Sequence, residues 1–448
     1  MNTKILSRAL TLWTNNQIFI SQKFLANYCT NTENVPFRVD YYSNGSTTYL
    51  DNSLNYVLNQ KIKLKTQREK ILKKNFKYLL RSKSYEENFY VKMSNPTVNY
   101  FAHSFIDRCS DKRKDSEWIN QQIKNENTVF VLFHVDKPFV SVNDSKNMYS
   151  ICKFNYSQIK QFLDSKCPYV FLGLEYTKNS SDITNLSPYS NPESYDKTVY
   201  KAWFVIETSA YDQNLENISN SFIEYGKFFE GNFLRLMAIQ DLKESSIIAQ
   251  ARSVLCWIDR NKFCASCGTP SQLDDAGSKL TCKNQDCKSN NKALNKHVPS
   301  NIHYPRVDPV AIMLIINKTQ THVLLGRKKQ FPKNMFSCLA GYIEAGESIE
   351  EAVRRESFEE SGIYTDKVVY HSSQPWPFPS TLMIGCFAYA TSHELNIDQD
   401  EIQEARWFSL QDLELILKNQ HPESITIPTE RTIAHQLISH FSKHGSKL

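Results

Sequence analysis

Three glutamates, Glu356, Glu359 and Glu360, are spaced so that a helix would place them on one face. Like charges this close repel one another unless a cation joins them. Hard divalent ions such as Mg²⁺ take oxygen ligands, usually one or two carboxylates together with water and substrate phosphates. The spacing therefore points to metal-assisted phosphate chemistry. A solvated acidic face that balances Arg354 and Arg355 is the alternative.

A second set of residues with metal-binding chemistry is formed by two cysteine pairs. Cys264 and Cys267 are separated by two residues, and Cys282 and Cys287 by four. Four thiolates in two pairs suit tetrahedral Zn²⁺ in a closed structural site, because no position is left open for water. Disulfides or free thiols remain the alternative, since the second spacing is wider than usual. We expect a zinc knuckle that links two larger units.

The glutamates require a helix with defined ends, and the sequence supplies both. Ser348 can cap the N-terminus, with Glu351 reaching back to complete a capping box, and Gly362 is a left-handed stop. The apolar stripe that would face the core comprises Ile349, Ala352 and Val353. We therefore predict about four turns of helix after the glycine turn at Gly341.

Strands are predicted on both sides of this helix, at residues 310–316, 322–326, 336–340, 367–370, 383–390 and 405–408. The first two should form a hairpin, and the third should run into Gly341. Helices are expected at 410–418 and 429–443. A mixed sheet between helices is an α/β/α layering.

The segment from Ser373 to Thr381 carries prolines at alternate positions, Pro375, Pro377 and Pro379. Alternating prolines favour an extended, rigid loop that fixes Trp376 and Phe378. A structural loop or a proline-rich ligand for a small domain is the alternative, but the closeness of the segment to the acidic helix favours a pocket wall.

The region from about residue 96 to 260 has the sequence pattern of a folded α+β domain, and it contains no catalytic motif. Strand-like runs lie in 127–142, 169–175 and 199–207, and helical patterns in 218–237 and 245–259. Residues 1–94 are polar, with a basic run at 61–83 that carries ten Lys or Arg. An amphipathic basic helix could meet RNA or an anionic membrane, and a solvated face or poorly ordered arm is the alternative.

Composition limits the class of protein. The chain has 448 residues, 41% of them hydrophobic, and a net charge of +6 that does not by itself call for nucleic acid. No run of 18 apolar residues occurs, so we predict no transmembrane segment. Eleven cysteines, seven of them scattered, favour a reducing compartment.

The two ends of the chain carry features of different targeting signals. The chain finishes with Ser446-Lys447-Leu448, which at a free C-terminus is a peroxisomal signal read by the import receptor. The first 32 residues lack acidic side chains and resemble a mitochondrial presequence, so a mitochondrial or cytoplasmic location is the alternative.

The pattern Gly341, Glu347, Arg355-Glu356, Glu359-Glu360, Gly362-Ile363 resembles the Nudix box of the Nudix hydrolases, which cleave nucleoside diphosphates linked to another group. One position departs from the box, because Ser357 stands where the family has an aliphatic residue. Its hydroxyl should bond the carbonyl of Val353, at a cost of about 1 kcal/mol.

The segment SQPWPFPST, residues 373–381, resembles the array that marks the NADH pyrophosphatases, with Thr381 in place of the final Ser. With the cysteines, the HYPRVDP segment at 303–309 and the SKL terminus, the chain resembles the eukaryotic peroxisomal type of this family. The resemblance is good from about Cys264 to the end, loose from Pro96, and does not cover residues 1–94, which we take as a separate basic N-terminal region. It implies a Nudix α/β/α sandwich, with domains at 95–260 (NADH pyrophosphatase-like domain), 261–300 (zinc ribbon) and 301–448 (Nudix domain).

The resemblance also implies an activity, cofactors and site residues. Members split NADH, and less readily NAD⁺, into nicotinamide mononucleotide and AMP, remove NAD caps from RNA, and form homodimers. Mg²⁺ or Mn²⁺ would be held by Glu356, Glu360 and Glu401, with Glu359 as a further ligand or the residue that orients water, while Arg355 orients carboxylates. Substrate contacts would come from Tyr304, Ala340, Gly341, Tyr342, Gln374, Pro375, Trp376, Pro377, Phe378, Pro379, Ser380, Thr381 and Ala434.

Several functions fit these residues. We favour hydrolysis of NADH and NAD⁺, and removal of NAD caps from RNA is the second hypothesis. A coenzyme A diphosphatase would not explain the 374–381 segment. An inactive Nudix binding module is disfavoured because Arg355, Glu356, Glu359 and Glu360 are all present.

Overall fold

The computed structural model describes residues 99–445 except 103, 144–147, 179–188, 190–194, 213, 230–238, 240 and 291–301. The segment 1–94, its basic run at 61–83 and the tripeptide Ser446-Lys447-Leu448 lie outside the described residues. The predictions for these segments, including both targeting signals, stay predictions.

The first domain contains a mixed sheet with helices on both faces. Its elements are α4 (Ser116–Lys124), β1 (Val129–His134), β2 (Lys137–Asn143), β3 (Met148–Ile151), α5 (Tyr156–Asp164), β4 (Tyr169–Lys178), β5 (Tyr195–Glu207), α6 (Leu215–Ser221), β6 (Lys227–Phe228) and α8 (Leu242–Arg260). The strand order is β3-β2-β1-β5-β4, with β6 paired to β2, and β1 runs parallel to β5.

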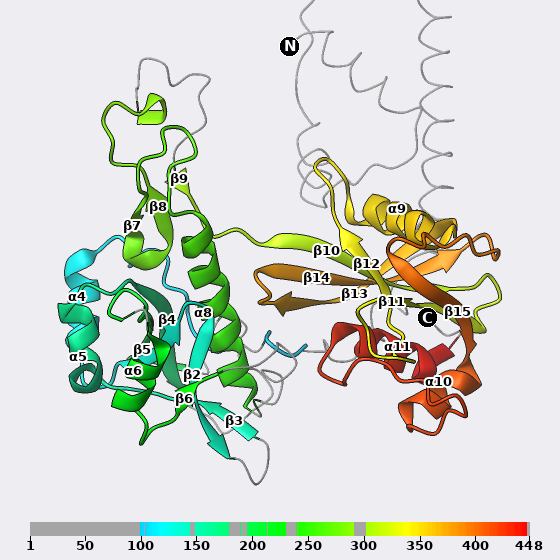
Figure 1. Cartoon of the computed structure of the whole chain (residues 1–448), viewed down its shortest axis with the longest axis horizontal. Helices are drawn as coiled ribbons and strands as arrows, with labels where there is room; N and C mark the ends of the chain where they lie inside the picture. Colours follow the sequence, from blue (N-terminus) through cyan, green and yellow to red (C-terminus); the bar gives the residue numbers. More distant parts are fainter. Residues whose placement is uncertain are drawn as a thin grey trace, which may run out of the picture. The chain divides into compact units, whose positions relative to one another are not determined.

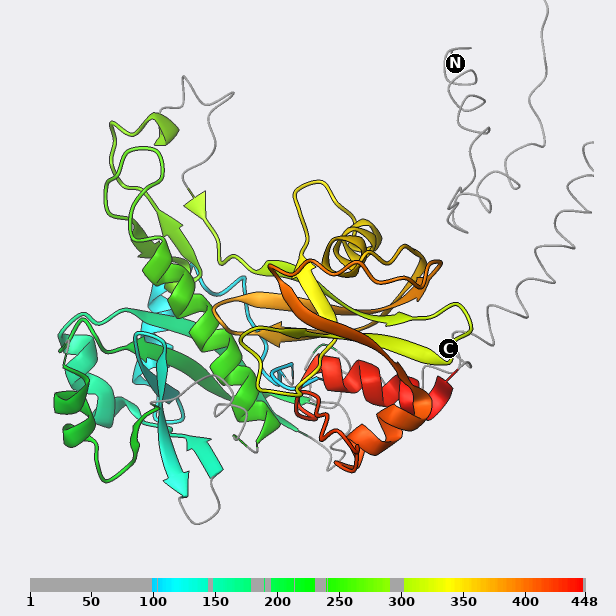
Figure 2. The same cartoon turned by 45° about the vertical axis from the view of Figure 1, so that its right-hand side comes forward.

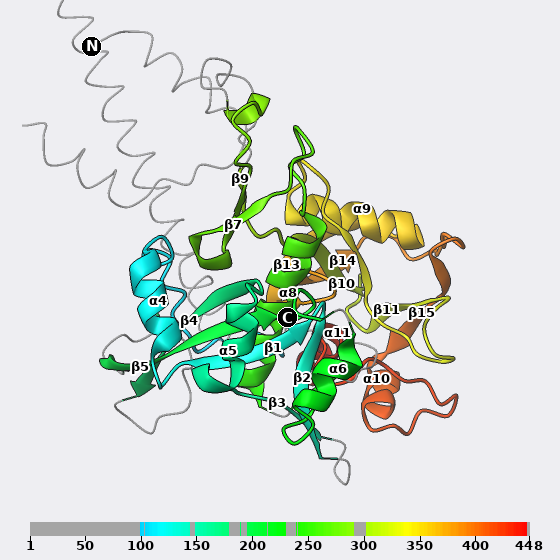
Figure 3. The same cartoon turned by 60° about the vertical axis from the view of Figure 1, so that its left-hand side comes forward.

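The helices of this domain cover the sheet unevenly. Apolar residues of α4, α5 and α6 form one core with one face of the sheet, and those of α8 form a second core with the other face. Figures 1 and 3 show α4 and α5 side by side on their face. Because both faces are covered, β1 is almost continuously buried rather than alternating. The predicted mixed α+β domain is confirmed.

One helix prediction in this domain is wrong. A helix was expected over 218–237, but α6 ends at Ser221 and the chain then forms the short strand β6 against β2, while residues 230–237 lie outside the described residues. Gly226 lies between them at φ +158°, where a Cβ would overlap the carbonyl of Val140. This close backbone approach lets Phe228 enter the core, at 1% exposure, which a continuous helix would prevent.

A small module of three strands follows α8. It comprises β7 (Gln272–Asp274), the short helix η2 (Asp275–Gly277), β8 (Lys279–Thr281), the short helix η3 (Lys288–Asn290) and β9 (Ile302–His303). The strands pair in the order β7-β8-β9, all antiparallel. A module this small has little apolar core, so its stability must come from another source.

The second domain contains the acidic helix. Its elements are β10 (Asp308–Ile316), β11 (His322–Lys328), β12 (Leu339–Tyr342), α9 (Ile349–Ser361), β13 (Thr365–Trp376), β14 (Thr381–Ala390), β15 (Ile402–Ser409), α10 (Leu410–Leu417) and α11 (Ile433–His444). The strand order is β13-β14-β10-β11-β15, with β12 paired antiparallel to β10.

The α/β/α layering predicted for this domain is confirmed. Helix α9 packs on one face of the sheet, and α10 and α11 pack on the other, as Figure 2 shows in the yellow and red segments. The β10–β11 hairpin is antiparallel as expected, and β10 pairs in parallel with β14. The turn that follows β12 therefore enters α9 directly above the sheet.

Two predicted features differ in detail. The third strand, expected at 336–340, is observed at Leu339–Tyr342, and Ser337 makes only an isolated bridge to Gly326. The expected 373–381 loop is mostly strand, since β13 continues to Trp376 and pairs there with Thr381. Prolines are tolerated because β13 is the edge strand of the described sheet, where a missing N–H costs no ladder bond.

Candidate active site

Helix α9 begins and ends at the residues that the sequence indicates. The Ser348 hydroxyl accepts from the Glu351 N–H at 3.2 Å, and the Glu351 carboxylate accepts from the Ser348 N–H at 2.7 Å. Gly362 adopts φ 72°, and its N–H donates to the Phe358 carbonyl. The capping box and the left-handed stop are both confirmed, and they fix the register of the glutamates between them.

The inner face of α9 is apolar with one exception. Ala352 and Val353 are fully buried against the sheet, and Ile349 packs beside them. Ser357 is also fully buried, and its hydroxyl donates to the Val353 carbonyl at 2.6 Å, as predicted. The hydroxyl is thereby satisfied within the helix, so the departure from the box leaves the acidic face in place.

Two of the glutamates are buried, one against strand β12 and the other beside the end of β11. Glu356 is 8% exposed and Glu360 is 1% exposed. The carboxylate of Glu356 lies directly against Gly341, where a Cβ would overlap it. Burial raises the pKa of Glu356, although Arg355 opposes the shift. Gly341 is therefore what makes room for this carboxylate, and it does so as a residue of strand β12 rather than of the predicted turn.

Arg355 joins three of the carboxylates. Its guanidinium donates to Glu347 at 2.6 and 2.8 Å, to Glu356 at 2.7 Å and to Glu359 at 2.8 Å. It also donates to the carbonyl of Tyr342. These hydrogen bonds lower the pKa of Glu347 to about 2. Arg355 thus ties the helix to the turn and holds the orientation of each carboxylate it contacts.

Glu360 is held differently. The ammonium of Lys328, at the end of β11, lies 3.1 Å from its Oε1 atom. Within the described part of the chain, neither oxygen of Glu360 accepts a well-aligned hydrogen bond. Burial raises the pKa of Glu360 to about 7, with Lys328 opposing the shift. A buried carboxylate with unused lone pairs is what a hard cation requires of a ligand.

Glu401 reaches this site from the loop before β15. It is exposed, and its negative charge contributes to raising the pKa of Glu356 and Glu360. Glu359 is also exposed, at 55% of its side chain. Among the described residues, only the four cysteines gather three or more potential ligand atoms within 4.8 Å of one another. Instead, Arg355 forms ion pairs with Glu347, Glu356 and Glu359, and Lys328 forms one with Glu360.

The residues expected to contact substrate fall into two groups. The first is open to solvent. Tyr342 is 61% exposed and Tyr304 is 64% exposed, and Ala340 and Gly341 are partly exposed on β12 beside the glutamates. A ligand that approaches the acidic helix would meet Tyr342 and the β12 backbone first.

The second group is buried. Its central member is Gln374, which is fully buried on β13 and uses its amide in three directions. The NH₂ group donates to the carbonyls of Tyr100, at 3.1 Å, and Arg431, at 2.8 Å, and the amide oxygen accepts from the N–H of Ile433 at 2.8 Å. Ala434, next along α11, is also buried. Gln374 therefore connects three segments far apart in the sequence.

The β13–β14 turn packs on the residues before α4. Phe101 makes edge contacts with Trp376 and Phe378, at ring distances of 6.3 and 6.0 Å. The guanidinium of Arg252 lies over the Phe378 ring and donates to the carbonyl of Pro377. The other members of this turn differ in exposure: Pro377, Ser380 and Thr381 are buried, Pro375 is partly buried and Pro379 is exposed.

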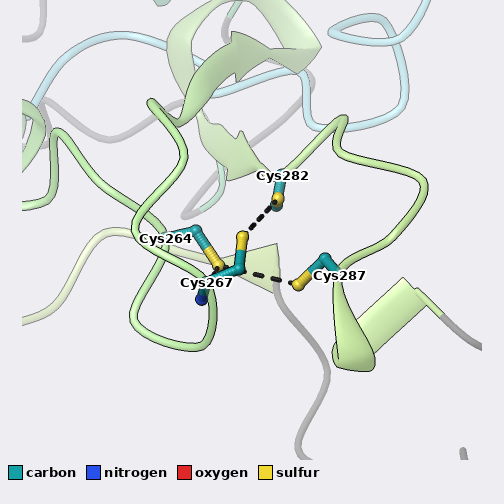
Figure 4. Close-up of side chains that lie close together, drawn as sticks. All are labelled: Cys264, Cys267, Cys282 and Cys287. Carbon is teal, nitrogen blue, oxygen red and sulfur yellow. Dashed lines mark hydrogen bonds between the residues drawn. The ribbon is translucent and has the colours of Figure 1, made fainter.

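The four cysteines converge from two loops of the small module (Figure 4). The Sγ atoms of Cys264 and Cys287 lie 3.9 Å apart, and those of Cys267 and Cys282 lie 3.6 Å apart. Four sulfurs around one tetrahedral Zn²⁺ at its usual bond length are about 3.8 Å apart. The N–H groups of Ser266 and Cys267 donate to Cys264 Sγ, which favours the thiolate. The donor set and its spacing therefore fit zinc.

Sequence reasoning missed the residues that hold the site from outside the box. Lys328 appears in the sequence only as part of a short basic run after a strand, and Tyr100, Arg252 and Arg431 lie in segments without a motif. Their roles depend on contacts between segments up to 274 residues apart. A basic residue at the end of the second strand of the hairpin was the one available signal, and it was not specific.

Comparison with known proteins agrees with this geometry. Residues 307–428 match the model of the NUDIX domain family. The chain is 39% identical over 359 residues to the human NAD-capped RNA hydrolase NUDT12, which covers 78% of this chain and 74% of that protein. It is 33% identical over 367 residues to an NAD-capped RNA hydrolase of Schizosaccharomyces pombe, covering 77% and 92%.

A third relative carries a different name. The human mitochondrial NAD(P)H pyrophosphatase NUDT13 is 34% identical to this chain over 254 residues, which cover 53% of this chain and 67% of that protein.

Proposed function

The chain belongs to the NADH pyrophosphatase family of Nudix hydrolases, and we propose that it hydrolyses the diphosphate of NADH and NAD⁺ to nicotinamide mononucleotide and AMP. The observation that carries this proposal is the pair of buried carboxylates on α9, Glu356 against Gly341 of β12 and Glu360 beside Lys328 of β11. Within the described part of the chain, four carboxylates (Glu347, Glu356, Glu359 and Glu360) share only two cations here, Arg355 and Lys328, and a divalent ion would supply the missing positive charge.

The ligand set for the catalytic ion comprises Glu356, Glu360 and Glu401, with Glu359 as a further ligand or as the residue that orients water. Mg²⁺ or Mn²⁺ held there would neutralise the diphosphate and lower the pKa of a water molecule. Arg355 keeps Glu356 and Glu359 directed toward the turn through its hydrogen bonds. Because Arg355 already bonds four groups, it serves to orient the carboxylates rather than to bind phosphate.

Substrate selection is assigned to the turn and to the β13–β14 hairpin. Tyr304 and Tyr342 present exposed rings that could stack on a base, and Ala340 and Gly341 offer backbone beside the glutamates. The hairpin contributes residues 374–381, and Ala434 lies beside it at the start of α11. For Gln374 the geometry supports a contribution through the backbone it holds, since its side-chain amide is fully used.

A panel of substrates tests the activity. Purified protein is assayed with NADH, NAD⁺, NADPH, ADP-ribose, coenzyme A and NAD-capped RNA, with Mg²⁺ or Mn²⁺, and AMP is measured. We expect NADH and NAD⁺ to be cleaved, with turnover reduced by orders of magnitude in Glu360→Gln and in Glu359→Gln. Glu350→Gln is the matched control, because Glu350 is exposed on the same helix away from these contacts. A near-normal rate in Glu360→Gln would refute the assignment.

Removal of NAD caps from RNA is the second candidate, favoured by the names of two of the relatives. The basic run at 61–83 would then bind the RNA chain. Deleting it should weaken turnover of NAD-capped RNA while turnover of NADH stays unchanged. Equal loss on both substrates would count against a specific role for this run. A preference for coenzyme A in the panel would instead favour a coenzyme A diphosphatase. Absence of turnover on every substrate of the panel would favour an inactive Nudix binding module.

We further propose that the cysteine cluster holds a structural Zn²⁺ that fixes the β7–β9 module. The sulfur–sulfur distances of 3.9 and 3.6 Å support this, and a closed set of four sulfur ligands disfavours catalysis at the ion.

We propose that the chain forms a homodimer and that its SKL signal directs it to the peroxisome. A homodimer would appear as twice the chain mass in light scattering. No helix in the described residues is long and apolar enough to span a membrane. For location, a fluorescent fusion that leaves Leu448 free is compared with one that masks it. Identical location of the two would contradict peroxisomal import through the SKL signal.

A further inference from the structure

Lys328 is a cation that the function proposed above does not use. It ends β11, and its ammonium lies 3.1 Å from Glu360 Oε1 and 3.5 Å from the carbonyl of Ala340. Its side chain is 29% exposed, whereas that of Glu360 is 1% exposed. The lysine therefore reaches from the solvent edge of the site to its most deeply buried carboxylate.

The pairing of this lysine is specific to Glu360. Arg355 contacts Glu347, Glu356 and Glu359, and no ion pair between Arg355 and Glu360 occurs in the described part of the molecule. The charges of Glu356 and Glu401 act on Glu360 unfavourably. Lys328 thus supplies the positive charge that offsets the burial of Glu360.

A divalent ion on Glu360 would meet this lysine. Mg²⁺ binds carboxylate oxygen at about 2.0–2.1 Å, so it would lie within a few ångströms of an ammonium on the same group. Two cations so close repel each other, and the repulsion is strong where water is largely excluded. Binding of the ion must therefore either displace Lys328 or work against its charge.

We propose that Lys328 is a positioning residue that competes with the divalent ion for Glu360 and so sets the metal concentration at which the site fills. The inference rests on the proposed role of Glu360 as a metal ligand. By linkage, the lysine stabilises the metal-free protein and weakens metal binding through the same contact. Replacing it with a neutral side chain should change these two quantities in opposite directions.

The test measures metal binding directly. Zinc-loaded full-length protein is freed of other divalent ions and titrated with Mn²⁺, and free Mn²⁺ is followed by electron paramagnetic resonance. Lys328→Met should bind Mn²⁺ about five- to tenfold more tightly than the wild type, the low end of typical coupling between sites. The same variant should unfold at a lower temperature without added Mn²⁺, and Mn²⁺ should restore more of its stability than it does in the wild type.

Three variants separate the possible outcomes. Lys329→Met removes the same charge from the exposed neighbouring residue, and it should leave affinity and melting temperature near wild type. Lys328→Gln provides a second neutral variant if Lys328→Met does not fold. Unchanged or weaker Mn²⁺ affinity in folded Lys328 variants would overturn the proposal. Glu360→Gln should lose Mn²⁺ binding, and if it binds normally, the proposed ligand set fails instead.

Discussion

Gly341 lies against the carboxylate of Glu356 so closely that a Cβ at this position would overlap the carboxylate carbon and both oxygens. The glycine belongs to β12 and the glutamate to α9, and the two are fifteen residues apart in the chain. A strand glycine and a helix glutamate that look like separate features in the sequence are therefore in direct contact. The position of the carboxylate depends on the absence of a side chain opposite it.

Gly341→Ala should uncouple activity from stability. The added methyl group must push the Glu356 carboxylate away, which displaces a proposed metal ligand, so we expect kcat/KM to fall by about a hundredfold or more. The free energy of unfolding should fall by only about 1–2 kcal/mol, since the group that moves is the end of a side chain. Steady-state kinetics and chemical denaturation measure the two effects.

Gly346→Ala is the matched control for this turn. A Cβ at Gly346 would meet nothing within 4 Å, but its φ of +93° is strained for an alanine. We expect about 1 kcal/mol of destabilisation with a much smaller loss of kcat/KM. Equal losses of activity in the two variants would contradict the special role of Gly341.

Gln374→Glu should destabilise the protein by about 2–4 kcal/mol, because it removes two donors and places a charge against the carbonyls of Tyr100 and Arg431. Urea unfolding provides the measurement. Ser373→Ala, at the partly exposed neighbour, should be near neutral. A stable Gln374→Glu protein with a raised KM alone would instead indicate direct contact of this side chain with substrate.

Removal of the metal from the cysteine cluster should lower the melting temperature. The β7–β9 module has little apolar core, so Cys287→Ser should abolish zinc binding and unfold the module. Zinc is measured by mass spectrometry, with one ion per chain expected in the wild type. Cys256→Ser, which alters a cysteine on α8 outside the cluster, should keep its zinc. Full zinc content in Cys287→Ser would contradict the assignment.

His371 makes stability depend on pH on the acidic side. Its Nδ1 atom lies 2.8 Å from the Ser372 hydroxyl and its Nε2 atom 3.3 Å from His440 Nδ1. Burial, reinforced by the charge of His440, lowers the pKa of His371 to about 4. The unfolded chain thus binds a proton more readily than the folded one between pH 6.5 and 4.

Neutral, buried His371 contributes to the free energy of unfolding. This contribution is fully present above about pH 6.5 and is lost as the pH falls toward 4, and it amounts to roughly 3 kcal/mol. Denaturation of the wild type and His371→Gln from pH 7 to 5 should show a shallower decline in the variant. His393→Gln, at an exposed histidine, should follow the wild-type slope. Parallel curves for wild type and His371→Gln would contradict the assignment to His371.

The features that the sequence alone determined are those with a short range along the chain. Ser348, Glu351 and Gly362 define both ends of α9 because capping joins residues three or four positions apart. The Ser357 bond to Val353, the β10–β11 hairpin and the pairing of the four cysteines follow from similarly local patterns. Even the extended backbone of the proline-rich segment was predictable, since proline restricts its own φ.

Only the tertiary structure decided which cations pair with the glutamates of α9 and which segments the β13–β14 hairpin contacts. Which glutamates pair with Arg355 and which with Lys328 depends on how β11 and β12 pack against α9. In the same way, the side chain of Gln374 donates to the carbonyl of Tyr100, which is 274 residues away. The wrong prediction of a helix over 218–237 has the same origin, because Phe228 is drawn into the core by its packing partners. Such contacts depend on the pairing of distant segments, and no periodicity within one segment records which partner it will meet.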